Sequence, residues 1–107
     1  MDMEKLVEAI EAHSGMSRGE IIEAGKYGAD AGWAEFTYTV DGARFYREHD
    51  ELVDELAEDV ADSFGVSVAE MVAGFIRSDM ADTRDGRDCL MAWFALEEAG
   101  RWLADEA

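Results

Sequence analysis

Proline is absent from this 107-residue chain, and cysteine occurs once. The lack of proline excludes a proline-rich linker or recognition arm. A lone Cys89 cannot form an internal disulfide, so we expect a reducing compartment, the cytoplasm. No stretch approaches the roughly 18 uninterrupted apolar residues of a membrane-spanning helix, and no basic-then-apolar signal opens the chain.

Basic residues are also scarce. Nine Lys and Arg oppose 26 Asp and Glu, which gives a formal net charge of −17. A chain this acidic repels phosphate, so direct binding to nucleic acid or to an anionic membrane is disfavoured. Hydrophobic residues make up 49%, which is too many for a disordered acidic tail, and the length predicts one folded domain over residues 1–107.

The spacing of apolar residues predicts helices. In the first, expected from Met3 to His13, Asp2 is suited to cap the start and Gly15 to end the helix in a left-handed conformation. Its apolar residues recur at three- and four-residue spacing and share one face: Met3, Leu6, Val7 and Ile10.

A second helix is expected from Arg18. Ser17 and Glu20 form an S-x-x-E capping box immediately around its start. We expect this helix to bury Ile21 and Ile22.

Residues 35–47 fit two structures. An alternating pattern followed by Asp41-Gly42 is typical of a small β-hairpin, with the alternating positions Phe36, Tyr38 and Val40. The competing interpretation is a short helix capped at Thr39 that runs to about Glu48. We favour the helix because Phe45-Tyr46-Arg47 breaks the alternation that a returning strand needs.

A clearer helix is expected from Asp50 to Phe64, with Gly65 as its end. Its apolar stripe comprises Leu52, Val53, Leu56, Val60 and Phe64. Ser67 and Glu70 form a second capping box, and the helix that follows should bury Met71, Val72, Phe75 and Ile76.

The last helix is expected from about Gly86 to Ala104, with Asp85 as its cap. It is apolar on nearly all sides between Cys89 and Leu96, and a helix without a polar face belongs in the centre of a bundle. The best core candidates are Leu90, Met91, Trp93, Phe94 and Leu96. The predicted fold is therefore all-α, a compact bundle of five or six short helices around a buried C-terminal helix.

The charge is unevenly distributed along the chain. Residues 48–76 hold nine acids and no Lys or Arg, which accounts for over half of the net charge. Eight carboxylates over about 22 Å of helix give one per ~2.7 Å, against one per ~1.7 Å in duplex DNA. Such a rod would attract the basic grooves that hold DNA or RNA. The expected partner-binding carboxylates are Glu48, Asp50, Glu51, Asp54, Glu55, Glu58, Asp59 and Asp62.

Two aromatic residues in the irregular segment, Trp33 and Tyr38, are further candidates for partner contact, because loop aromatics often anchor an interface. Most other aromatic residues are explained by core packing.

Other interpretations of the charge remain open. The acidic run could be an ordinary solvated face, an adaptation to high salt, or incidental to a regulatory interaction module, including a homodimer, that binds through apolar surface. Asp79, Asp82, Asp85 and Asp88 recur every three residues, but they lack the ligand spacing of a calcium-binding loop and arginines lie among them. We therefore expect no metal and no cofactor. No catalytic motif is present, and we expect no enzyme.

Four segments form a recognisable set: Tyr27-Gly28-Ala29-Asp30-Ala31-Gly32, Phe36-Thr37-Tyr38, Phe45-Tyr46 with His49, and Ala92-Trp93-Phe94-Ala95-Leu96-Glu97-Glu98. Together they resemble a family of small, uncharacterised acidic proteins encoded by bacteriophages and prophages. The resemblance covers roughly residues 25–103 and brings no catalytic residues with it. Asp41-Gly42 and the dense acids of residues 50–62 depart from the family pattern.

A phage setting implies a functional class. Small acidic proteins of phages resemble anti-defence inhibitors, including anti-CRISPR and antirestriction proteins, which occupy the nucleic-acid surface of a host nuclease complex. By this analogy the partner is a basic host protein or nucleoprotein complex, such as a CRISPR effector or a restriction enzyme, in the host cytoplasm.

Overall fold

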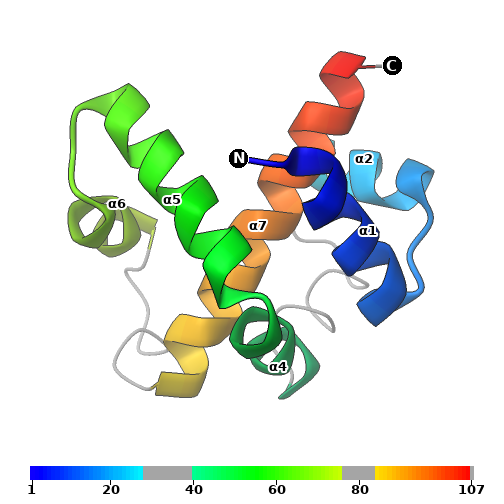
Figure 1. Ribbon diagram of the computed structural model, residues 1–107, viewed down its shortest axis with the longest axis horizontal. Coiled ribbons are helices and arrows are strands. Elements are labelled where there is room, and N and C mark those ends of the chain that lie inside the picture. The colour runs from blue at the N-terminus through cyan, green and yellow to red at the C-terminus, as the bar shows by residue number, and fades with distance from the viewer. Residues whose placement is uncertain (28–39, 76–83, 107) are drawn as a thin grey trace.

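Helix α7 (Arg84–Glu106) runs through the middle of the molecule, and the other helices pack around it (Figure 1). The computed structural model describes residues 1–27, 40–75 and 84–106, and these contain six helices and no strand. The other five are α1 (Met3–Ser14), α2 (Arg18–Tyr27), α4 (Val40–Glu48), α5 (Asp50–Phe64) and α6 (Val68–Phe75). The predicted compact all-α fold is confirmed, with overall dimensions of 32 × 29 × 25 Å.

The core lies along α7. Its most extensive contacts are with α2 and α4, and smaller ones join it to α1 and α5. Ala92, Ala95 and Ala99 are fully buried, and such small side chains let neighbouring helices approach closely. Four of the five predicted core residues are buried, whereas Trp93 is only half-buried. The prediction of a buried C-terminal helix is confirmed.

The start and end of α1 and the start of α2 are those that their sequence predicts. The backbone N–H of Lys5 donates to the Asp2 carboxylate at 3.1 Å, and Gly15 adopts the left-handed conformation with φ 74°. The Ser17–Glu20 capping box is reciprocal, since each backbone N–H donates to the other residue's side chain. These are local interactions, which explains why sequence alone identifies them.

The hairpin interpretation of residues 35–47 is wrong wherever the structure describes that segment. Val40–Glu48 is helix α4, while Thr39, its expected cap, lies outside the described residues. Helical spacing brings Phe45, the largest fully buried side chain of the described residues, into the core. The ring of His13 meets Phe45 edge-on at 5.4 Å, and the ring of His49 lies 4.9 Å away.

Two further predictions need correction. Helix α7 begins at Arg84, so Asp85 lies inside its first turn and does not cap it. Phe64 was expected in the buried stripe of α5, but it is 72% exposed because the helix extends past the edge of the core. Within that stripe Val53 and Leu56 are buried, and Leu52 and Val60 are half-buried.

Candidate functional site: the acidic face of helix α5

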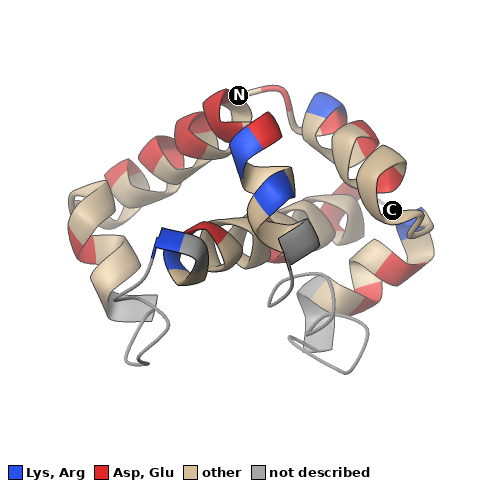
Figure 2. Ribbon diagram, turned by 90° about the horizontal axis from the view of Figure 1, so that it is seen from below, with Lys and Arg blue, Asp and Glu red and all other residues tan. Residues whose placement is uncertain are grey.

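Seven carboxylates line the outer side of α5, and every one of them is exposed. We call this set the acidic face: Asp50, Glu51, Asp54, Glu55, Glu58, Asp59 and Asp62. Successive residues of a helix are turned by about 100°, so the seven positions occupy roughly half of its circumference. The opposite half carries the buried residues Val53, Leu56 and Ala57, and the buried Ala61 lies at the edge of the acidic half. Figure 2 shows the acidic positions as a nearly continuous run along this helix.

The helix dipole stabilises negative charge at the N-terminal end of α5 and destabilises it at the C-terminal end. Asp50 and Glu51 lie in the first turn, where the positive end of the helix dipole stabilises them. The last turn contains no basic residue, although the dipole is negative there and Asp62 adds to it. Gly65 ends the helix in the left-handed conformation, with φ 70°. The C-terminal end of the acidic face is therefore electrostatically unfavourable within the free molecule.

Few groups of the protein contact the acidic face. The Tyr46 hydroxyl donates to Asp54 at 2.6 Å, and the amino group of Met1 lies 3.3 Å from Glu55 and 3.9 Å from Asp59. Within residues 1–27, 40–75 and 84–106, the remaining four carboxylates have neither an ion pair nor a hydrogen bond from a side chain: Asp50, Glu51, Glu58 and Asp62. These four are available to cations of a partner.

Glu48, the eighth predicted carboxylate, belongs to α4 and not to α5. Arg44, one turn earlier, donates to it at 3.0 Å, and this hydrogen bond lowers the pKa of Glu48 from its usual value. Because an arginine of its own helix already pairs with it, Glu48 is less available than the acidic face. The pKa of Tyr46 is raised, first by burial and then by its hydrogen bond to Asp54, so the phenol stays a proton donor at neutral pH.

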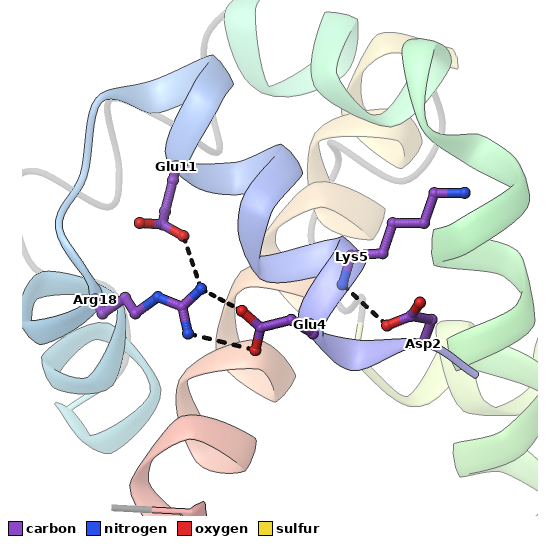
Figure 3. A network of polar contacts seen from close by, with 5 residues as sticks. All are labelled: Asp2, Glu4, Lys5, Glu11 and Arg18. Carbon is purple, nitrogen blue, oxygen red and sulfur yellow. Dashed lines mark hydrogen bonds and ion pairs between the residues drawn. The ribbon is translucent and has the colours of Figure 1, made fainter.

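Arginines neutralise carboxylates elsewhere in the molecule. Arg18 of α2 forms a two-pronged ion pair with Glu4 and also approaches Glu11 at 3.3 Å, which joins α2 to α1 (Figure 3). The pKa of Glu4 is lowered, chiefly by the hydrogen bond from Arg18. Arg47 of α4 donates at 2.6 Å to Asp88, a buried carboxylate of α7.

The comparison with known proteins yields a family. A family model described as a domain of unknown function (DUF7222) matches residues 2–107. The chain belongs to the DUF7222 family. No curated protein and no solved structure matches this DUF7222 chain. The family description names no activity.

Some predicted residues of this DUF7222 chain lie outside the described part. Trp33 and Tyr38 are among them, as are Asp79 and Asp82 of the three-residue repeat. Asp88, the last aspartate of the repeat, is committed to Arg47. No group of three or more His, Cys, Asp or Glu side chains in the described ranges is arranged to hold a metal ion. None of the described helices has the length and apolarity needed to cross a membrane.

One small pocket lies on α7, lined by Trp93, Phe94, Glu97, Glu98 and Arg101. Its volume of about 50 Å³ suits a few water molecules, whereas small-molecule sites measure about 300–1,000 Å³. The indole N–H of Trp93 is buried without a hydrogen-bond acceptor in the described residues, and a water molecule in this region would satisfy it.

Sequence reasoning missed Phe64 as a surface residue. It is the one large hydrophobic side chain that the described residues expose. Phe64 follows Val60 and Ala57 at helical spacing, so the pattern of apolar residues predicts that it continues the apolar stripe of α5. Its place at the last residue before a helix-ending glycine was the available signal, since residues at helix ends often extend past the core.

Proposed function

We propose that this protein is a non-enzymatic inhibitor that binds the basic nucleic-acid-binding surface of a host nuclease complex. The acidic face of α5 takes the place of nucleic-acid phosphates in this proposal. The observation that carries it is the exposure of seven carboxylates on one helix with no arginine paired to them in the described residues.

The physical argument rests on charge spacing and rigidity. Like charges four residues apart, such as Glu51/Glu55 and Glu58/Asp62, each cost an isolated helix about 0.2–0.5 kcal/mol. A helix fixed to the core through Val53 and Leu56 holds them in place despite that cost. The arrangement favours binding to a basic groove in two ways. Electrostatic attraction raises the association rate, and Arg–carboxylate pairs stabilise the complex after docking.

The biological setting comes from the resemblance to phage and prophage proteins. In that setting the partner is a CRISPR effector or a restriction enzyme, and the inhibitor acts in the cytoplasm of the host. The resemblance supports this class by analogy, and the acidic face supports the mode of binding.

A phage-plating assay tests the function directly. The protein is expressed in bacteria that carry one of several defined CRISPR or restriction systems, and a phage sensitive to that system is plated. We expect the protein to raise the plating efficiency against at least one system by an order of magnitude or more. Unchanged plating against all the systems would refute the proposal.

A matched pair of variants links the effect to α5. The triple change E51K/E58K/D62K reverses three carboxylates that have no described partner, so folding should be preserved. The control E8K/E23K/E106K changes the net charge equally at exposed acids of α1, α2 and α7. We expect the first variant to lose inhibition and the control to retain it. Equal loss in both would show that overall charge matters and the acidic face does not.

Salt dependence separates the proposal from binding through apolar surface. With the inhibited nuclease purified, affinity should collapse at about 0.5 M NaCl, where charges more than a few ångströms apart are screened. Affinity that survives such salt would favour an apolar interaction module.

A further inference from the structure

The C-terminal end of α5 combines two features that are unfavourable in the free protein. Phe64 exposes 72% of its surface, although the transfer of a phenylalanine side chain from water into a protein interior is favourable. Asp62, two residues earlier, adds negative charge at the negative end of the helix dipole, and no basic residue of the last turn offsets it. Phe64 lies outside the buried core, Asp62 has no ion pair in the described residues, and both lie at the same end of one helix.

The sequence that follows Asp62 is uncharged as far as Glu70. Residues 63–69 contain no ionisable side chain in a chain that is 33% charged. Val66 and Val68, which follow Phe64 in this stretch, are half-buried against the core. The ring of Phe64 therefore projects from an uncharged tip, and the acidic face begins within one turn on the same helix.

Phe64 and the acidic face point to different sides of α5, but they are close together. A helix with its side chains is only about 10–12 Å across, so one groove that receives the end of α5 contacts both. An ordinary protein interface covers about 800 Å² on each partner, which is ample for this end.

A positively charged groove with exposed aromatic rings is the usual design of a site for single-stranded nucleic acid. The cations follow the phosphates, and successive bases stack on the aromatic side chains. We propose that Phe64 takes the place of a stacked base beside the carboxylates that take the place of phosphates. The partner that binds this end of α5 is then a basic protein, and the end of α5 docks into its groove for single-stranded nucleic acid. This inference rests on the proposed function and narrows it from nucleic-acid surfaces in general to single-strand grooves.

A second copy of the chain suits this end poorly. Each copy carries a formal charge of −17, and burying Phe64 against another molecule would bring two acidic faces together. A basic partner has the complementary charge.

Peptide binding tests the inference without knowledge of the natural partner. The probes are two peptides of equal length and charge in which arginine alternates with tryptophan or with glycine. We expect the protein to bind both in low salt, and the tryptophan peptide at least about 5-fold more tightly, the lower end of one aromatic–base stack. Fluorescence anisotropy measures both affinities.

Variants at Phe64 decide whether the ring acts by stacking. Phe64→Ser and Phe64→Leu should both abolish the preference for tryptophan, while Phe64→Trp keeps it. Stability should change little in all three because the side chain is exposed, and thermal unfolding checks this. Full preference in Phe64→Leu would overturn the base-like role, because leucine is apolar but cannot stack.

The remaining outcomes separate this inference from the proposed function. Binding of neither peptide would refute the acidic face as a binding surface. Equal binding of both peptides would leave the acidic face supported and overturn the role of Phe64. A dimer in sedimentation that Phe64→Ser dissociates would make a second copy the occupant and would also overturn the inference.

Discussion

Carboxylates at the junction between α1 and α2 are paired with an arginine, whereas those on α5 are not in the described residues. At that junction one arginine, Arg18, pairs with Glu4 and Glu11 and joins two helices (Figure 3). On α5 the described contacts are the Met1 amino group and one tyrosine hydroxyl, and no arginine. Two arginines, Arg18 and Arg47, thus join helices through carboxylates, and others pair within their own helix, whereas no arginine of the described residues pairs with α5.

This difference bears on how the acidity is explained. In the described residues α1, α4 and α7 each have carboxylates paired with arginine, although exposed acids such as Glu8, Glu23 and Glu106 have no described ion pair. What distinguishes α5 is the density of its charge, since seven exposed carboxylates lie on its 15 residues and none is paired with an arginine in the described residues. That density supports a role for this surface in binding.

The largest effect is expected where an arginine is removed from a buried carboxylate. Arg47→Leu leaves the side chain of Asp88, which is 8% exposed, with Arg84 at 4.0 Å as its one ion-pair partner among the described residues. We expect the free energy of unfolding to fall by about 2–3 kcal/mol, measured by urea denaturation. The double variant R47L/D88L should recover much of this loss, because no buried charge is then left unpaired. Loss of under ~0.5 kcal/mol in R47L would show that Asp88 does not depend on Arg47.

A substitution on α5 is expected to raise the free energy of unfolding. Glu58→Lys replaces two like-charge neighbours, with Asp54 and Asp62, by attractive pairs. We expect the free energy of unfolding to rise by about 0.5–1 kcal/mol at low ionic strength, and the gain to shrink as salt is added. Glu23→Lys on α2 is the control, because its charged sequence neighbours three positions away are one acid, Glu20, and one base, Lys26, whose effects oppose each other. Destabilisation by Glu58→Lys would mean that the acidic face supports the fold.

The smallest effect is expected at the exposed pair of Glu4 and Arg18, and it depends on pH. The pKa of Glu4 is lowered from 4.5, so its contribution to stability is present above that value and is lost as the pH falls through the lowered pKa. The difference in unfolding free energy between wild type and Glu4→Gln should therefore shrink towards zero in acid. Denaturation at neutral pH and near pH 3 measures it. A difference that is the same at both pH values would exclude the ion pair as its source.

Local signals predicted much of the fold. Asp2, Gly15 and the Ser17–Glu20 box act within a few residues, so the sequence contains all that determines them. The choice between helix and hairpin at residues 40–47 was harder, because a short apolar run fits both periods. Burial of Phe45 against α1 and α7 favours the helix, and that is a tertiary effect.

The site was predicted in part for the same reason. The acidic face follows from the helical spacing of its residues, but the exposure of Phe64 depends on where the core ends. The bond between Arg47 and Asp88 joins residues 41 positions apart, so no local pattern could reveal it.

The position of α7 in the chain has a consequence for biosynthesis. Helices α1, α2, α4 and α5 all leave the ribosome before the segment that their apolar faces contact. Until residues 84–106 emerge, the earlier helices have no central helix to pack against, and the nascent polypeptide exposes apolar surface. The carboxylates of residues 50–62 emerge within that interval, and their mutual repulsion would keep neighbouring nascent chains apart until the last helix arrives.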